Sequence, residues 1–224
     1  MSENADKHGQ TPEGKESLIP KHGGFRNLKT FQLAQLIYDI TVRFCDRFVS
    51  PRSRTHDQMV QAARSGTQNI AEGSVDSATS KKIELKLTGI AKGSLEELRL
   101  DYQDYLRQRS LPEWPPEHPA LMRFKALRCS TMDEFRMWVA EETKRNTDEH
   151  RPALTDTKQD TKGGGGSSVS VFPSVCVANG VLSLLNLCIY LLDRQLRTLA
   201  ETFEKEGGFT ERLYRVRSER RRNN

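Results

Sequence analysis

Hydrophobic side chains recur every three or four residues between positions 59 and 105, in two runs separated by a short break. The first run, over residues 55–72, includes small residues such as Gly66, and the second, over residues 79–109, is rich in leucine and isoleucine. This spacing is typical of helices that bury one face. The pattern therefore predicts a pair of helices whose apolar faces need other segments to cover them, because a lone helix pair is marginally stable in water.

We expect the two helices to meet in an elbow at residues 69–73. Gly73 fits the left-handed backbone conformation just past a helix end, where a side chain would be penalised. Asn69 and Glu72 would hold the turn by hydrogen bonds. A hydroxyl side chain would then cap the second helix by accepting a backbone N–H bond. Three residues are candidates for this cap: Ser77, Thr79 and Ser80.

Two glycines, Gly89 and Gly93, lie four residues apart inside the second helix and therefore on one face of it. Each costs about 1 kcal/mol relative to alanine in a helix interior. Close packing against a neighbouring helix would offset that cost. The spacing thus predicts that this face of the helix is a contact surface.

Further helical patterns flank this pair. Residues 27–48 form one amphipathic run, which ends before Pro51 because proline disfavours helix at the residue preceding it. Residues 120–128 and 131–145 form two shorter runs, and residues 174–206 form a long one. Strand-like alternation is scarce, so we expect an all-α protein in which the first and last long helices cover the central pair.

These patterns divide the 224 residues into six segments. We expect a disordered tail (1–24), three helices (25–110), a Pro-rich loop with a helical insertion (111–150), a flexible Gly/Ser linker (151–173), a fourth long helix (174–206) and a basic suffix with a tail (207–224). Residues 209–217 should dock on the body, and residues 218–224 should be free.

The fourth long helix leaves an alternative open. No charged side chain occurs between residues 163 and 192, and about 20 apolar residues suffice to cross a bilayer. Asn179, Gly180 and Asn186 weaken that interpretation. A helix that is apolar nearly all round is equally explained by burial on two sides, inside the protein and against another copy of the chain.

Charge is concentrated at the end of the chain. Of a formal net charge of +5, residues 207–224 contribute six arginines against two glutamates. A basic end on a nearly neutral body suggests an acidic partner, most simply RNA or DNA, although a solubilising tail has the same composition. The candidate phosphate-binding residues are Arg212, Arg215, Arg217, Arg220, Arg221 and Arg222, with Lys81, Lys82 and Lys86 of the 79–109 helix as a second basic group. Those lysines alternate with glutamates, so a solvated charged face is the competing interpretation.

The sequence gives little support for metal binding, disulfide bonds, catalysis or cofactor binding. The four cysteines and five histidines are scattered without metal-ligand spacing, so we expect neither a metal site nor a disulfide framework. Motifs typical of nucleophilic catalysis, phosphate loops, dinucleotide sites or paired carboxylates are absent from the sequence, so we expect no enzyme and no cofactor. The N-terminus has no apolar signal region, which favours a cytoplasmic protein.

Several stretches resemble one family. Residues 64–73 (RSGTQNIAEG), 80–84 (SKKIE) and 90–98 (IAKGSLEEL) are similar to four-helix-bundle proteins encoded in intervening sequences of large-subunit ribosomal RNA genes, and to accessory variability proteins of diversity-generating retroelements. The match covers about residues 25–109, and the fourth helix matches by pattern only. Residues 207–217 (GGFTERLYRVR) resemble a suffix domain of some members.

The resemblance implies a bacterial protein with an antiparallel up-and-down four-helix bundle, here with a helical insertion between helices 3 and 4. It also implies a homo-oligomer, suspected to be a pentamer, with a basic surface that contacts nucleic acid, and in the retroelement members a reverse transcriptase as partner. The insertion departs from the short loop of the family. No catalytic residues are established there, so none can be assigned.

These observations lead to one expected function and two rivals. We expect a non-enzymatic oligomeric helical protein that binds nucleic acid or a nucleic-acid-processing protein through its basic residues. The first rival is a pure protein–protein assembly module that docks through Phe135, Trp138 and the fourth long helix. The second is a protein anchored in a membrane through residues 175–192.

Overall fold

The computed structural model describes residues 24–149 and 168–222, and within these ranges every regular element is a helix. The tail predicted for residues 1–24, apart from Gly24, lies outside the described residues, as does most of the predicted linker. The elements are η1 (Phe25–Asn27, a 3₁₀ turn), α1 (Lys29–Phe48), α2 (Arg54–Asp76), α3 (Lys81–Gln108), α4 (Pro119–Leu127), α5 (Met132–Glu149), α6 (Ser168–Glu206) and α7 (Phe209–Arg222). The prediction of an all-α protein is therefore confirmed for this part of the chain.

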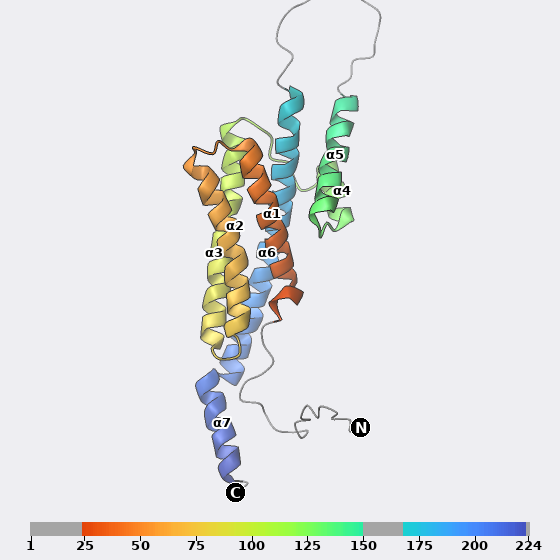
Figure 1. Ribbon diagram of the computed structural model, residues 1–224. Coiled ribbons are helices and arrows are strands. Elements are labelled where there is room, and N and C mark those ends of the chain that lie inside the picture. Colours follow the sequence, from red (N-terminus) through yellow and green to blue (C-terminus); the bar gives the residue numbers. More distant parts are fainter. Residues whose placement is uncertain (1–23, 150–167, 223–224) are drawn as a thin grey trace, which may run out of the picture.

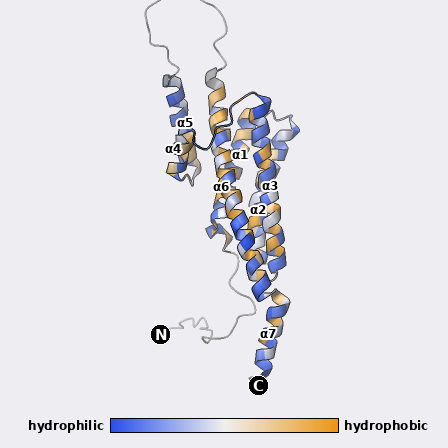
Figure 2. Ribbon diagram, turned by 180° about the vertical axis from the view of Figure 1, so that it is seen from behind, coloured by the Kyte–Doolittle hydropathy of each residue, from blue (hydrophilic) through white to orange (hydrophobic). Residues whose placement is uncertain are grey.

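The four long helices α1, α2, α3 and α6 share one core. Helix α2 packs along α3, α3 along α6, and α1 against both α2 and α6, so each helix buries its apolar face between two neighbours. Phe44, Leu95, Tyr102 and Leu185 are among the fully buried side chains. Burying each large apolar side chain contributes about 1.5–3 kcal/mol. Figure 2 shows hydrophilic and hydrophobic residues mixed along α2 and α3 and mostly hydrophobic residues in the first half of α6.

The elbow predicted at residues 69–73 is wrong, because α2 continues through it to Asp76. The turn comes later, and Ser80 caps α3 by accepting a bond from the backbone N–H of Ile83 at 3.2 Å. Asn69 donates from Nδ2 to the Ser65 carbonyl at 2.8 Å, a bond within α2, and Glu72 is exposed. Gly73 is a buried helical residue where a Cβ would lie 3.3 Å from Cβ of Leu87, so it serves close packing of α3 rather than a left-handed turn.

The prediction for the other glycines is also wrong. A Cβ at Gly89 or Gly93 would meet no atom within 4 Å, so neither residue makes a close helix contact. Gly66 makes that contact instead, since a Cβ there would lie 2.6 Å from Cδ2 of Leu95. Close approach of α2 and α3 therefore depends on Gly66 and Gly73, which lie about two helical turns apart on the same face of α2.

Helices α4 and α5 form a small hydrophobic unit against α6. Phe124, Phe135 and Trp138 pack together, with ring centroids 4.5–5.7 Å apart, and all three are buried. The rings of Phe135 and Trp138 rest on Gly180 of α6. The aromatic side chains that the sequence suggested as an external docking surface are thus covered by the protein's own helix.

The Pro-rich loop between α3 and α4 is held by Asn179 of α6. Its side-chain oxygen accepts from the backbone N–H of Trp114 at 2.7 Å, and its amide donates to the carbonyls of Pro112 and Val175 at 3.0 and 2.9 Å. Asn179 is 2% exposed, and burial of an amide requires such partners. This asparagine is therefore a structural clamp.

Helix α6 begins at Ser168, earlier than the predicted residue 174, and accommodates Pro173 near its start. By length and composition its apolar part could cross a membrane, yet 67% of the most apolar 18-residue window is buried inside the protein. Burial of that kind is what a core helix shows. Gly207, with φ of +72°, follows the helix in the left-handed conformation, and the observed end at Glu206 matches the predicted end at residue 206.

Candidate nucleic-acid interface

The basic suffix forms a helix of its own. The N-terminus of α7 is closed by Glu211, whose Oε2 accepts from the backbone N–H of Gly208 at 2.8 Å. The helix continues to Arg222, so residues 218–222, which were predicted to be a free tail, are helical. Residues in the last turn of a helix face its negative end, where cations are stabilised by about 0.3–1 kcal/mol each. Arg220, Arg221 and Arg222 occupy that turn.

Helix geometry arranges the arginines in rows. At 3.6 residues per turn, Arg217 and Arg221 lie on one side of α7, and Arg215 and Arg222 lie on another. Between these rows runs a strip that contains Val216, which is 8% exposed and stands apart from the main core, and also Arg220, which is exposed. The arginines are thus spread over several sides of α7, and more than one of these sides can face phosphates.

The arginine side chains of α7 differ in their burial and in the hydrogen bonds that they make within the protein. Arg212 is half-buried, and Arg215 donates from Nη1 to the carbonyl of Glu206 at 3.1 Å. The remaining four are exposed and pair with no carboxylate among the described residues: Arg217, Arg220, Arg221 and Arg222. These four are therefore the cations of α7 that are open to a phosphate.

The lysines predicted as a second basic group lie at the start of α3. Lys82 and Lys86 are exposed and one helical turn apart, whereas Lys81 donates to Oε2 of Glu84 at 3.1 Å. The start of α3 and the start of α7 lie at the same end of the molecule (Figure 1). The structure thus brings Lys82 and Lys86 to the end that carries α7 and leaves Lys81 in a local ion pair.

The residues proposed for the elbow do not belong to this interface. Asn69 and Gly73 are used inside α2 and against α3, and Glu72 is an exposed carboxylate that would repel phosphate.

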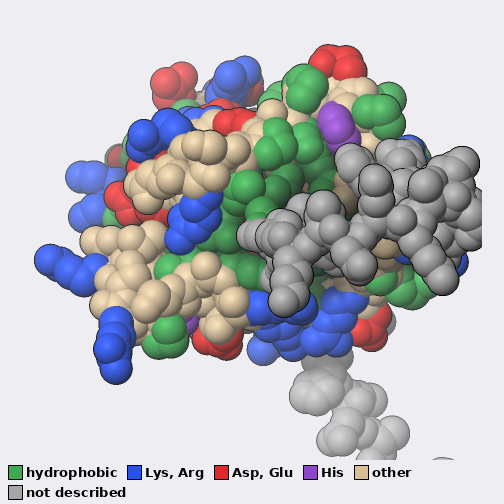
Figure 3. All heavy atoms as spheres, turned by 90° about the horizontal axis from the view of Figure 1, so that it is seen from above, with side chains coloured by type: hydrophobic (Ala, Val, Ile, Leu, Met, Phe, Trp, Pro, Cys, Tyr) green, Lys and Arg blue, Asp and Glu red, His purple; other side chains and the backbone are tan. Residues whose placement is uncertain are grey.

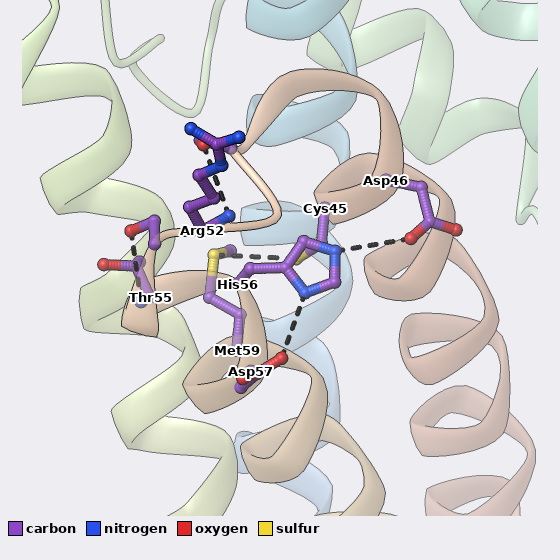
Figure 4. A network of polar contacts seen from close by, with 9 residues as sticks. Cys45, Asp46, Arg52, Thr55, His56, Asp57 and Met59 are labelled. Carbon is purple, nitrogen blue, oxygen red and sulfur yellow. Dashed lines mark hydrogen bonds and ion pairs between the residues drawn. The ribbon is translucent and has the colours of Figure 1, made fainter.

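A polar network lies at the opposite end, where α1 passes into α2 (Figure 4). The ring of His56 stands between two carboxylates, with Nε2 3.3 Å from Oδ1 of Asp46 and Nδ1 3.4 Å from Oδ1 of Asp57. Such a ring can donate to both only when it is protonated. His56 thereby ties the end of α1 to the first turn of α2, a role that its polar sequence surroundings did not reveal.

All four cysteines are free and buried, and burial raises the pKa of Cys45 and of Cys188 to about 12 and of Cys129 to about 11. Within residues 24–149 and 168–222, no group of three or more His, Cys, Asp or Glu side chains is placed to hold a metal ion.

Sequence reasoning missed one cationic cluster. An apolar groove far from α7 is bordered by four cations, Arg43, Arg47, Arg136 and Lys144, which come from two helices more than eighty residues apart in the chain. Each is an ordinary exposed cation in its own segment, so only the packing of α5 beside α1 reveals the cluster.

Comparisons of the chain with models of known protein families, with curated proteins and with solved structures find no match.

Proposed function

We propose that this protein binds nucleic acid through α7, with Arg217, Arg220, Arg221 and Arg222 contacting phosphates. The observation that carries the proposal is the projection of α7 beyond the end of the packed helices (Figure 1). All four of these arginines are exposed on it. Lysine and arginine contacts to phosphate release bound counterions, and this release supplies most of the affinity of sequence-independent binding. Lys82 and Lys86 extend the cationic surface at the same end.

The arrangement of α1, α2, α3 and α6 supports a fuller proposal about the fold. We infer an antiparallel up-and-down four-helix bundle of the family that the sequence resembles, in which α4 and α5 are an insertion before the fourth helix and α7 is the suffix. The pairwise packing of α1–α2, α2–α3, α3–α6 and α6–α1 supports it. The protein would act in the cytoplasm and without catalysis.

Assembly into a homo-oligomer, in the form of a pentamer, is part of the same proposal. Leu187 and Tyr190 of α6 are 46% and 57% exposed, although α6 is otherwise a core helix. A second copy of the chain would remove these side chains from water. Several copies of α7 would then multiply the phosphate contacts, and a nucleic-acid-processing enzyme could bind alongside. Native mass measurement, with absorbance at 260 nm to detect bound nucleic acid, tests this assembly.

The two rival functions have weaker support. The assembly-module hypothesis relied on Phe135 and Trp138, which are 2% and 1% exposed within the chain. The membrane hypothesis relied on the apolar part of α6, most of which the protein itself buries.

The experiment that tests the function is a fluorescence-anisotropy titration of labelled RNA and DNA, single-stranded and duplex, at low salt. The variant R217Q/R220Q/R221Q/R222Q keeps the side-chain length and should weaken binding by at least about tenfold. A variant at the other end of the protein, R43Q/R47Q/R136Q/K144Q, removes the same charge and should bind as the unmodified protein does. Equal loss in both variants would show a net-charge effect and reject α7 as the interface.

A further inference from the structure

A groove of 580 Å³ lies between α1, α5 and α6, at the end of the molecule opposite α7. Its walls are mainly apolar, and they include Phe44 and Phe48 of α1, Val139 of α5 and Val177 of α6. Figure 3 looks down on this end and shows hydrophobic side chains gathered in its middle with Lys and Arg side chains beside them. The groove is independent of the proposed nucleic-acid interface.

The border of the groove is cationic. Arg43, Arg47, Arg136 and Lys144 belong to its lining, and the lining contains no carboxylate. Arg43 donates to the carbonyl of Asp39 at 2.9 Å, and the guanidinium of Arg47 lies 5.3 Å from the centre of the Phe48 ring. These contacts leave N–H donors on both guanidinium groups, because each carries five.

The two cations from α5 are also available for a ligand. Arg136 is within 3.4 Å of the exposed carboxylate of Asp133, a surface pair that contributes little. Lys144 is exposed and has no partner among the described residues. Four cations at an apolar groove therefore attract an anion that also has apolar surface.

Size distinguishes between the possible occupants. A helix 10–12 Å across fills on the order of 500 Å³ per turn, so the groove holds about one turn of a partner helix. That is too little for the three or four anchors of a helix-in-groove complex. Small-molecule sites, in contrast, fall at about 300–1,000 Å³ and are mostly apolar with a few placed polar groups.

We propose that this groove binds a free single-chain anionic amphiphile, such as a long-chain carboxylate. Its alkyl chain lies against Phe44, Phe48, Val139 and Val177, and its head group is held by the arginines and Lys144. Arginine suits a carboxylate because its planar guanidinium can donate two parallel bonds to the two oxygens.

Calorimetric titration of the full chain with decanoate and dodecanoate, each below its micelle concentration, tests the proposal. Each buried methylene should tighten binding about fourfold, so dodecanoate should bind about fifteenfold more tightly than decanoate. Dodecanol should bind at least about tenfold more weakly than dodecanoate, because it lacks the charge that the cations recognise. Equal affinities for dodecanol and dodecanoate would overturn the proposal.

Two variants locate the site. A140W places an indole at an exposed position that lines the groove and should abolish binding, whereas A126W, at an exposed position of α4 outside it, should not. R43Q/R47Q/R136Q/K144Q should reduce dodecanoate affinity to that of dodecanol, whereas R217Q/R220Q/R221Q/R222Q should leave it unchanged. Helix content and melting temperature show that each variant is folded.

Unchanged dodecanoate binding by folded A140W would overturn the proposal. So would binding to phosphatidylglycerol vesicles without binding to the free carboxylates, since that result indicates a membrane surface as the ligand.

Discussion

The contact between α5 and α6 depends on the missing side chain at Gly180. A Cβ at this position would lie 2.6 Å from Cζ3 of Trp138 and 3.0 Å from Cε2 of Phe135. Both ring atoms belong to rigid, buried side chains, and the Trp138 ring is backed by Phe124 at a centroid distance of 4.5 Å. The substitution Gly180→Ala must therefore push α5 away from α6.

Two opposing effects determine how much Gly180→Ala changes the stability of the protein. Alanine in place of glycine in a helix interior adds about 1 kcal/mol to stability. Overpacking of a filled core costs about 1–3 kcal/mol, and rigid rings place this site in the upper part of that range. The expected net loss is about 1–2 kcal/mol, which corresponds to a fall in melting temperature of about 4 °C for a chain of this size.

Gly89→Ala is the matched control, because a Cβ at Gly89 meets nothing within 4 Å. It should gain the full helix preference of about 1 kcal/mol and raise the melting temperature by about 3 °C. Thermal unfolding followed by circular dichroism measures both changes. Trp138 fluorescence should shift to the red only in G180A, since that ring is 1% exposed in the native protein. If G180A is stabilised as much as G89A, the close packing of α5 on Gly180 is refuted.

Three further outcomes follow from side chains elsewhere. Glu142 is 4% exposed and accepts two hydrogen bonds of 2.6 Å from Arg123. The variant E142Q should therefore lower the free energy of unfolding, measured in denaturant, by about 2 kcal/mol. The control E141Q, at an exposed neighbouring position, should change it by less than about 0.5 kcal/mol. Backbone N–H bonds at the start of α5 hold the pKa of Glu134 below its ordinary value. The stability that the ionised Glu134 side chain gives to the fold is therefore complete above the ordinary glutamate pKa and is lost as pH falls through the lowered pKa. In a series of melting temperatures against pH, E134Q should reduce the decline on the acid side. Because burial raises the pKa of Cys45 and Cys188 to about 12, iodoacetamide at pH 8 should alkylate them about a thousandfold more slowly in the native protein than in denaturant, and rapid native labelling would contradict their burial.

The helices could be predicted from the sequence because burial of one face imposes a period of three to four residues on apolar side chains. Predicted and observed bounds of α1, α3 and α4 differ by only a few residues. The elbow could not be predicted in this way. Gly73 has the same identity in a turn and in a close helix contact, and only the approach of α3 to within 3.3 Å of its missing side chain distinguishes the two.

Of the two candidate binding surfaces, one could be predicted from the sequence and the other could not. The arginines of α7 could be found from the sequence because all six lie between residues 212 and 222. The groove at the other end could not, since it forms where α5 packs beside α1 and α6, and no local pattern encodes that packing. The burial of Phe135 and Trp138 could not be predicted for the same reason, because Gly180, against which they pack, belongs to α6 and is distant in the sequence.

The measurement that tests the central claim most directly is the salt dependence of binding to duplex nucleic acid. For each phosphate contact, the slope of log affinity against log salt concentration changes by roughly −0.9. If α7 is the interface, R217Q/R220Q/R221Q/R222Q should flatten the slope by about 3 to 4, and R43Q/R47Q/R136Q/K144Q should leave it unchanged. The same slope in the α7 variant and in the unmodified protein would contradict the account.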